Sequence, residues 1–269
     1  MHNDVFKTAW EILNTSDPDV KVSKSFQAFE EFSKLKDFSQ AESFELPVGA
    51  LPVPGRPDKP ELLQPRELPR RGIGSIEGQA TLLHAICHIE FNAINLAWDA
   101  VYRFRGMPDQ YYLDWMTVAK EEAYHFSLIR DYLVELGFAY GDFPAHNGLW
   151  EMAVDTDHDV LIRMALVPRV LEARGLDVTP GIMKRFESVN NKRANEILTI
   201  IQRDEIGHVE IGSHWFRYCC EQRNLDHDET FRDLLNQYLK SGLKKPINHD
   251  ARLKAGFTQN ELDYFESNL

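Results

Sequence analysis

Residues Val118–Leu133 read VAKEEAYHFSLIRDYL, an apolar pattern of helical spacing that Glu122 and His125 interrupt. A step of three residues on a helix turns about 300°, so both side chains lie on neighbouring parts of one face. One carboxylate and one imidazole placed in this way can reach the same metal ion. The segment therefore predicts a buried helix that carries half of a metal site.

The same motif returns later in the chain as Glu205-Ile-Gly-His208. Either copy alone is weak evidence for a metal site, because Glu and His are common residues. Each copy, however, follows another glutamate in an apolar helical stripe: Glu90 precedes Glu122 by 32 residues, and Glu172 precedes Glu205 by 33. One Glu from each of two helices, with Glu-x-x-His from each of two others, is the ligand pattern of di-iron and di-manganese carboxylate bundles.

The six candidate metal ligands are Glu90, Glu122, His125, Glu172, Glu205 and His208. The alternative is that the helical register is misread and the glutamates face solvent. Burying four carboxylates without cations would cost several kcal/mol each unless they were protonated or paired. Two bound divalent ions explain the pattern with fewer assumptions. Carboxylate and imidazole donors favour two iron ions, with manganese or a mixed manganese and iron pair as the alternative.

Apolar residues at steps of three and four predict four long helices, over residues 77–104, 109–136, 150–174 and 180–218. Asp109 is the expected N-cap of the second helix, and Gly137 is expected to end it. A proline inside a helix removes a backbone hydrogen bond, so Pro168 predicts a kink one turn before Glu172.

The flanking segments have a different character. Residues 1–40 are expected to form two helical pieces, residues 46–69 carry seven prolines and predict an extended strap, and a short helix is expected over 230–240. The predicted fold is all-α: a ferritin-like four-helix bundle with extra N- and C-terminal helices and a proline-rich strap. The expected division is 1–75 for the N-terminal helices and strap, 76–220 for the bundle and 221–269 for the C-terminal extension.

Composition narrows the classes of function. The chain has 269 residues, 43% of them hydrophobic, and a formal net charge of −12. This charge disfavours nucleic acid as a partner, although Arg70 and Arg71 could meet a local anion. No apolar run reaches the length of a membrane span, and the start of the chain does not resemble a secretory signal, so a cytoplasmic protein is expected. The three cysteines lack the spacing of a disulfide framework or a zinc site.

Several polar neighbours of the motifs have two interpretations. Asp204 and Glu121 directly precede motif glutamates, and each could either orient a ligating histidine or remain a surface acid. His84 and His88 are one helical turn apart. We interpret them as packing histidines or as supports of the site rather than as a separate metal pair, because His88 lies about 200° around the helix from Glu90.

Nearly the whole chain resembles the bacterial ferritin-like family called domain of unknown function 455. The resemblance rests on Gly55-Arg56-Pro57, Pro69-Arg70-Arg71, His84-Ala-Ile-Cys-His-Ile-Glu90, Glu121-Glu122-Ala-Tyr-His125, Leu171-Glu172-Ala-Arg-Gly-Leu-Asp177, Arg203-Asp204-Glu205-Ile-Gly-His208, Ala251-Arg252 and Ala255-Gly256-Phe257. It implies a ferritin-like bundle and the same six ligands, and it names no reaction.

Three functions fit the sequence. The leading hypothesis is a di-iron oxidase or hydroxylase that uses O₂ on a small-molecule substrate. The second is metal binding or storage without an organic substrate, which a large assembly would favour and a monomer or homodimer would exclude. The third is a helical interaction protein with a vestigial site, and this hypothesis predicts no stoichiometric metal.

Overall fold

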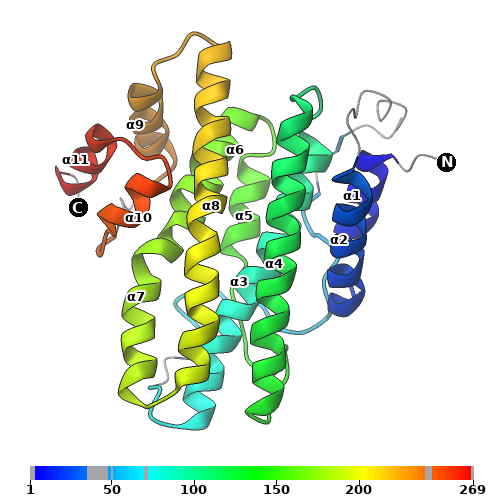
Figure 1. Cartoon of the computed structure of the whole chain (residues 1–269), viewed down its shortest axis with the longest axis vertical. Coiled ribbons are helices and arrows are strands. Elements are labelled where there is room, and N and C mark those ends of the chain that lie inside the picture. The colour runs from blue at the N-terminus through cyan, green and yellow to red at the C-terminus, as the bar shows by residue number, and fades with distance from the viewer. Residues whose placement is uncertain (1–3, 35–47, 50, 70–71, 240–243, 268–269) are drawn as a thin grey trace. The chain divides into compact units, whose positions relative to one another are not determined.

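The computed structural model describes residues 4–34, 48–49, 51–69, 72–239 and 244–267 (Figure 1). The regular structure in these residues is helical, with no strand apart from an isolated bridge between Leu62 and Ala145. The all-α prediction is therefore confirmed. The chain divides into two compact units, Met1–Val154 and Asp155–Leu269. The division into 1–75, 76–220 and 221–269 stays a prediction.

The first unit is built around a helical hairpin of α3 (Ile76–Arg103) and α4 (Asp109–Glu135), which pack along each other. Both helices match their predicted ranges to within one residue. The prediction that Asp109 caps α4 is wrong, because the N-cap is Pro108 and Asp109 is the first helical residue. A carboxylate in the first turn still favours the positive end of the helix dipole. Gly137 ends α4 as predicted, with a φ of 85°.

Two N-terminal helices pack against this hairpin: α1 (Val5–Leu13) contacts α3, and α2 (Pro18–Phe32) contacts α4. Buried polar groups fix their position. Lys21 is fully buried, and its Nζ donates to the Gly55 carbonyl at 2.9 Å and to the Asn95 side chain on α3. The Trp98 indole donates to Ser25 Oγ at 2.9 Å. Such donors and acceptors would each be costly to leave unpaired, so they select one docking geometry.

The proline-rich strap is non-helical over its described residues, 48–49 and 51–69, as predicted. The prediction for residues 46, 47 and 50 lies outside the described residues. Gly55 is required where the strap meets α1, because a Cβ there would lie 2.4 Å from the backbone of Asn14. Earlier in the strap, the Pro52 carbonyl accepts from the Trp150 indole on α5 (Gly148–Asp155) at 3.1 Å. The strap therefore ties α1 to the end of the first unit.

The second unit begins with α6 (Val160–Leu166), which continues into a π-helix, η2 (Val167–Glu172), and then α7 (Ala173–Ser188). The predicted single helix over 150–174 is wrong, because α5 ends at Asp155 and Asp159 caps a new helix. The irregularity expected at Pro168 takes the form of η2. Proline cannot supply its backbone N–H to a helical ladder, and π-helical turns often occur at functional sites.

The predicted helix over 180–218 is also two helices, since α7 ends at Ser188 and α8 (Lys192–Gln222) begins after a turn. Asn190 sits in that turn with a φ of 55°, a conformation that ends a helix and that asparagine tolerates. The Asn191 side chain then caps α8 by accepting from the Ala194 N–H at 2.9 Å. The two asparagines thus form the turn and the cap between α7 and α8.

Helix α8 is the central helix of the second unit, because α6, η2 and α7 all pack against it. Gly212 on α8 faces Pro168 of η2, and a Cβ at position 212 would lie 2.3 Å from Pro168 Cγ. Glycine therefore permits the close approach between α8 and the π-helix.

Three short helices complete the second unit: α9 (His227–Tyr238), α10 (His249–Lys254) and α11 (Gln259–Ser267). The first corresponds to the helix predicted over 230–240, of which residue 240 lies outside the described residues. The other two were not predicted. They are too short to show a clear periodic stripe, and helices of this length are marginal without tertiary support.

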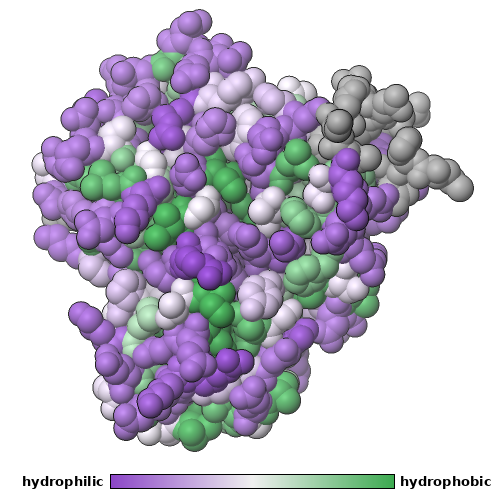
Figure 2. All heavy atoms as spheres, viewed as in Figure 1, coloured by the Kyte–Doolittle hydropathy of each residue, from purple (hydrophilic) through white to green (hydrophobic). Residues whose placement is uncertain are grey.

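Hydrophilic side chains cover much of the surface that Figure 2 shows, with hydrophobic ones scattered between them. This agrees with the net charge of −12. No described helix has both the length and the apolar character needed to cross a membrane.

Candidate metal centre

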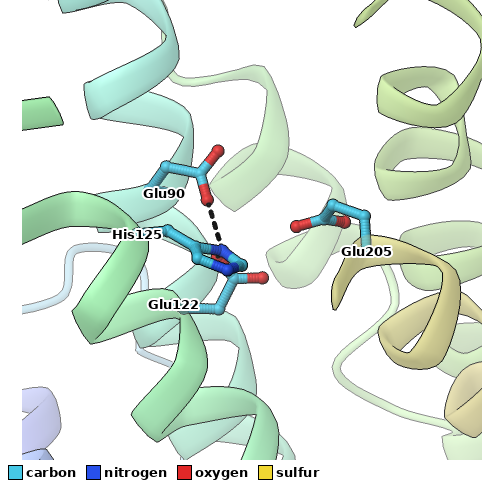
Figure 3. Close-up of side chains that lie close together, drawn as sticks. All are labelled: Glu90, Glu122, His125 and Glu205. Atoms are coloured by element: carbon cyan, nitrogen blue, oxygen red, sulfur yellow. Dashed lines mark ion pairs between the residues drawn. The ribbon is translucent and has the colours of Figure 1, made fainter. Parts of the chain in front are cut away.

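The hairpin of the first unit brings together Glu90 from α3 and both Glu122 and His125 from α4 (Figure 3). Their exposed fractions are 4%, 1% and 0%. Each occupies an apolar stripe of its helix, so the packing that buries the stripe also buries the ligand-type side chain. The structure therefore brings these three predicted ligands together in this unit, and their ligation of a metal stays a prediction.

The side chains of this half-site point toward one another. The Nδ1 atom of His125 lies 3.2 Å from Glu90 Oε2 and 3.7 Å from Glu122 Oε2. Each residue offers one candidate ligand atom, and these atoms lie within 4.8 Å of one another. Two carboxylates and an imidazole could therefore hold a metal ion here.

The electrostatics of the half-site favour a cation. Burial raises the pKa of Glu90 to about 8, the negative charge of Glu122 raises it as well, and the hydrogen bond with His125 opposes this shift. A carboxyl with this pKa holds its proton at neutral pH when no positive charge is nearby. A divalent ion would reverse that balance, because it stabilises the ionised carboxylates that ligate it. The donor set therefore fits a hard or borderline divalent metal.

The second unit holds the other three predicted ligands. Glu205 and His208 lie one turn apart on α8, with His208 Nδ1 3.4 Å from Glu205 Oε1. His208 is 1% exposed, whereas the Glu205 side chain keeps 12% of its exposure. Glu172 is 8% exposed and is the last residue of η2, which packs against α8. The structure thus pairs Glu205 with His208. Metal ligation by Glu172, Glu205 and His208 stays a prediction.

The neighbouring polar residues have roles of their own. Asp204 accepts hydrogen bonds from Arg203 at 2.7 and 3.1 Å. His84 accepts from the Gly141 N–H at 2.8 Å through Nε2. His88 lies 2.9 Å from the Tyr140 hydroxyl through Nδ1. The two histidine contacts tie α3 to the loop after α4, in agreement with the interpretation of both histidines as packing residues or supports of the site.

A second group of ligand-type side chains occurs in the second unit: His227, Asp228 and Glu261. Its carboxylates are already engaged, because both Glu261 oxygens accept from Arg169 at 2.6 and 2.7 Å. Asp228 accepts from Thr258 Oγ1 at 3.0 Å. We interpret this group as an ion-pair network. Nothing in the sequence spacing predicted it, because Glu261 lies 33 residues after Asp228.

Residues 14–263 match the family described as protein of unknown function (DUF455). The chain belongs to this family. An uncharacterized protein of Haemophilus influenzae (strain ATCC 51907 / DSM 11121 / KW20 / Rd) is 51% identical over 215 residues, which cover 77% of this chain and 75% of that protein. No solved structure matches the chain. The family and this relative carry no named activity.

Proposed function

We propose that this protein is a di-metal carboxylate protein of ferritin-like architecture. In this proposal α3, α4, α8 and the η2–α7 segment form one four-helix bundle. The two half-sites then join, so that Glu205 faces Glu90, Glu122 and His125. The observation that carries the proposal is the buried half-site of the first unit, in which two carboxylates and an imidazole converge.

The order of residues along the chain supports a second, equivalent half. Glu172 and the pair formed by Glu205 and His208 repeat the order of the first half-site. The two carboxylates of each half would together offset the charge of two divalent ions. This donor set suits iron or manganese, and iron is the proposed native metal.

When bound, two iron ions would supply redox chemistry with O₂, and the reaction class proposed is an oxidase or hydroxylase acting on a small organic molecule. The residues of the chain would hold and orient the metal. His125 turns its Nδ1 toward both carboxylates, so this nitrogen would be its ligand atom. Burial of the half-site would keep bulk water from the ions.

Metal analysis tests the proposal. Protein purified without added metal should contain about two ions per chain by the ligand count, and the Glu122→Ala, Glu205→Ala double variant should lose them. A matched control is Glu135→Ala with Glu210→Ala, which removes two exposed glutamates from the same two helices. Equal metal content in the wild type and in the ligand double variant would show that these residues are not the ligands.

O₂ consumption separates the reaction from metal binding alone. The anaerobically iron(II)-loaded wild type should consume O₂, and the ligand double variant should not. Iron-loaded protein that is inert towards both O₂ and peroxide would refute the oxidase or hydroxylase. In that case the size of the assembly would distinguish a storage shell from a smaller metal-binding protein.

A further inference from the structure

The C-terminal segment, residues 244–267, binds around the π-helix that carries Glu172. We propose that this segment is a clamp that positions Glu172 for metal ligation, with Arg169, Arg174 and Arg252 as positioning residues. The inference rests on the proposed function and concerns the second unit alone. It assigns a role to α10 and α11.

The first contact of the clamp is a buried ion pair between η2 and α11. Arg169 lies three residues before Glu172, and its Nη2 donates to both oxygens of Glu261 at 2.6 and 2.7 Å. The two residues are 1% and 2% exposed. Arg169 Nε also donates to Ser213 Oγ on α8 at 3.2 Å. The guanidinium therefore joins α8, η2 and α11 at one point.

Aromatic rings enclose the same guanidinium. Its central carbon lies 4.0 Å from the ring centre of Phe231 on α9, 4.6 Å from that of Phe257 and 4.7 Å from that of Phe216 on α8. Cation–π contacts of this kind strengthen when water is excluded. Arg169 is therefore held both by a carboxylate and by a cage of rings.

The second contact joins α10 to α7. Arg252 is 1% exposed and donates to Asp177 through Nε at 2.9 Å and through Nη2 at 2.7 Å. Asp177 lies five residues after Glu172, and it also accepts from the Asn248 N–H at 2.9 Å. A bidentate arginine–carboxylate pair fixes angle as well as distance. The start of α7 is thus held in one orientation.

The third contact lies at the surface, two residues after Glu172. Arg174 donates to the carbonyls of Lys244, Lys245 and Pro246 at 2.7, 2.9 and 2.8 Å. The three carbonyls form one bend of the C-terminal segment. The clamp thus contacts the chain three residues before, two residues after and five residues after Glu172.

The position of these contacts is the main argument. A π-helical turn departs from regular helical hydrogen bonding and needs tertiary support. Buried ion pairs are poor sources of stability compared with apolar packing, and their best-attested use is to specify one arrangement. The two buried pairs, Arg169–Glu261 and Arg252–Asp177, match that use, and Arg174 adds an exposed contact to the same segment. The arrangement that these contacts specify is the orientation of the Glu172 side chain at the end of η2.

Two clamp variants and one control test the inference. Glu261→Gln removes the buried charge partner of Arg169, and Arg174→Gln removes the partly exposed contact. Arg223→Gln is the matched control, because Arg223 makes a doubly hydrogen-bonded pair with Asp159 in the same unit and does not contact the C-terminal segment. All three are made in the full chain, with Glu172→Ala as a reference for loss of the ligand itself.

The first readout is hydrogen exchange of the metal-free protein over residues 167–177. Both clamp variants should exchange faster there, by about tenfold or more, whereas Arg223→Gln should match the wild type. The second readout is titration with Mn²⁺, counting free ion by electron paramagnetic resonance. The clamp variants should bind one of the two ions at least tenfold more weakly, and Glu172→Ala should show the same loss. If Glu261→Gln does not fold, Arg174→Gln decides the outcome.

The results separate this inference from the proposed function. Wild-type protein that binds no Mn²⁺ or iron would refute the proposed function, and exchange rates alone would then decide whether the segment orders the π-helix. Wild-type protein that binds two ions, with clamp variants that bind both equally well, would overturn the inference and leave the proposed function intact. Unchanged exchange in both clamp variants would overturn it as well.

Discussion

Raising the pH should destabilise the metal-free protein through Glu90. Burial and the facing charge of Glu122 raise the pKa of Glu90 to about 8 in the folded state, whereas the unfolded carboxyl titrates near its ordinary value of about 4.3. Between these values the folded state holds a proton that the unfolded state has released. The stabilising free energy that Glu90 contributes is therefore complete below the pKa that it has in the unfolded state. This contribution is lost as the pH rises through the pKa that Glu90 has in the folded state.

The magnitude follows from the shift. The free energy of unfolding should fall by up to about 1.4 kcal/mol per pH unit across this window, a total of several kcal/mol, and level off above a pH of about 8. Metal binding has the opposite dependence, because the ligating carboxylate must be ionised. Below the folded pKa the metal affinity should fall roughly tenfold per pH unit, with one proton released per ion bound.

Urea unfolding of the metal-free protein between pH 5 and pH 9 measures the first effect, and calorimetric Mn²⁺ titration in buffers of different ionisation enthalpy measures proton release. Glu90→Gln keeps the shape of the side chain and removes the charge. The free energy of unfolding of this variant should depend less on pH, and the metal-free variant should be more stable than the wild type at pH 9. The variant should also lose tight metal binding. Glu77→Gln, an exposed change on α3, is the control. Parallel pH profiles for Glu90→Gln and the wild type would refute this reasoning.

Two further substitutions test the packing that supports the site. Gly212→Ala places a methyl group 2.3 Å from Pro168 Cγ and so weakens the packing of α8 on η2. Overpacking of this kind should lower the free energy of unfolding, measured by urea denaturation, by about 1–3 kcal/mol. Asp99→Asn removes the charge partner of the buried Arg103 guanidinium, which lies 2.8 Å away. This change should lower the free energy of unfolding, measured by thermal denaturation, by about 3–5 kcal/mol.

Matched controls separate these effects from the general effect of substitution. Gly181→Ala adds the same methyl group to α7 with no atom within 4 Å, so it should stabilise the protein by about 0.5–1 kcal/mol. Glu196→Gln breaks an exposed pair with Arg193 at 3.3 Å and should change stability by less than about 1 kcal/mol. Equal losses at Gly212 and Gly181 would contradict the packing argument.

The first half-site could be predicted from the sequence because the relation between its residues is local. Glu122 and His125 lie three residues apart, and a helical turn brings such residues together whatever surrounds it. Glu90 could be added because it interrupts the apolar stripe of a helix whose range was predicted to within one residue. Sequence reasoning placed Glu172 on an inward face, but its π-helical setting depends on the fit between Pro168 and Gly212, residues that are distant in the chain.

The helix boundaries of the second unit were predicted less well for a related reason. Hydrophobic periodicity continues across a break when both helices face the same core. Asn190 ends α7 by adopting a positive φ, and asparagine carries only a weak sequence signal for that choice. Helices α10 and α11 are short and depend on tertiary contacts.

The sequence by itself determined the helical class of this protein, the ranges of α3 and α4, and the residues that their apolar stripes would bury. These features follow from spacings of three and four residues, which fix a helical face without further information. Only the tertiary structure decided that His125 lies between two carboxylates, that Glu172 ends a π-helix, and that Arg169 and Arg252 fasten the C-terminal segment around it. Those features depend on contacts between residues far apart in the chain, which local periodicity does not encode.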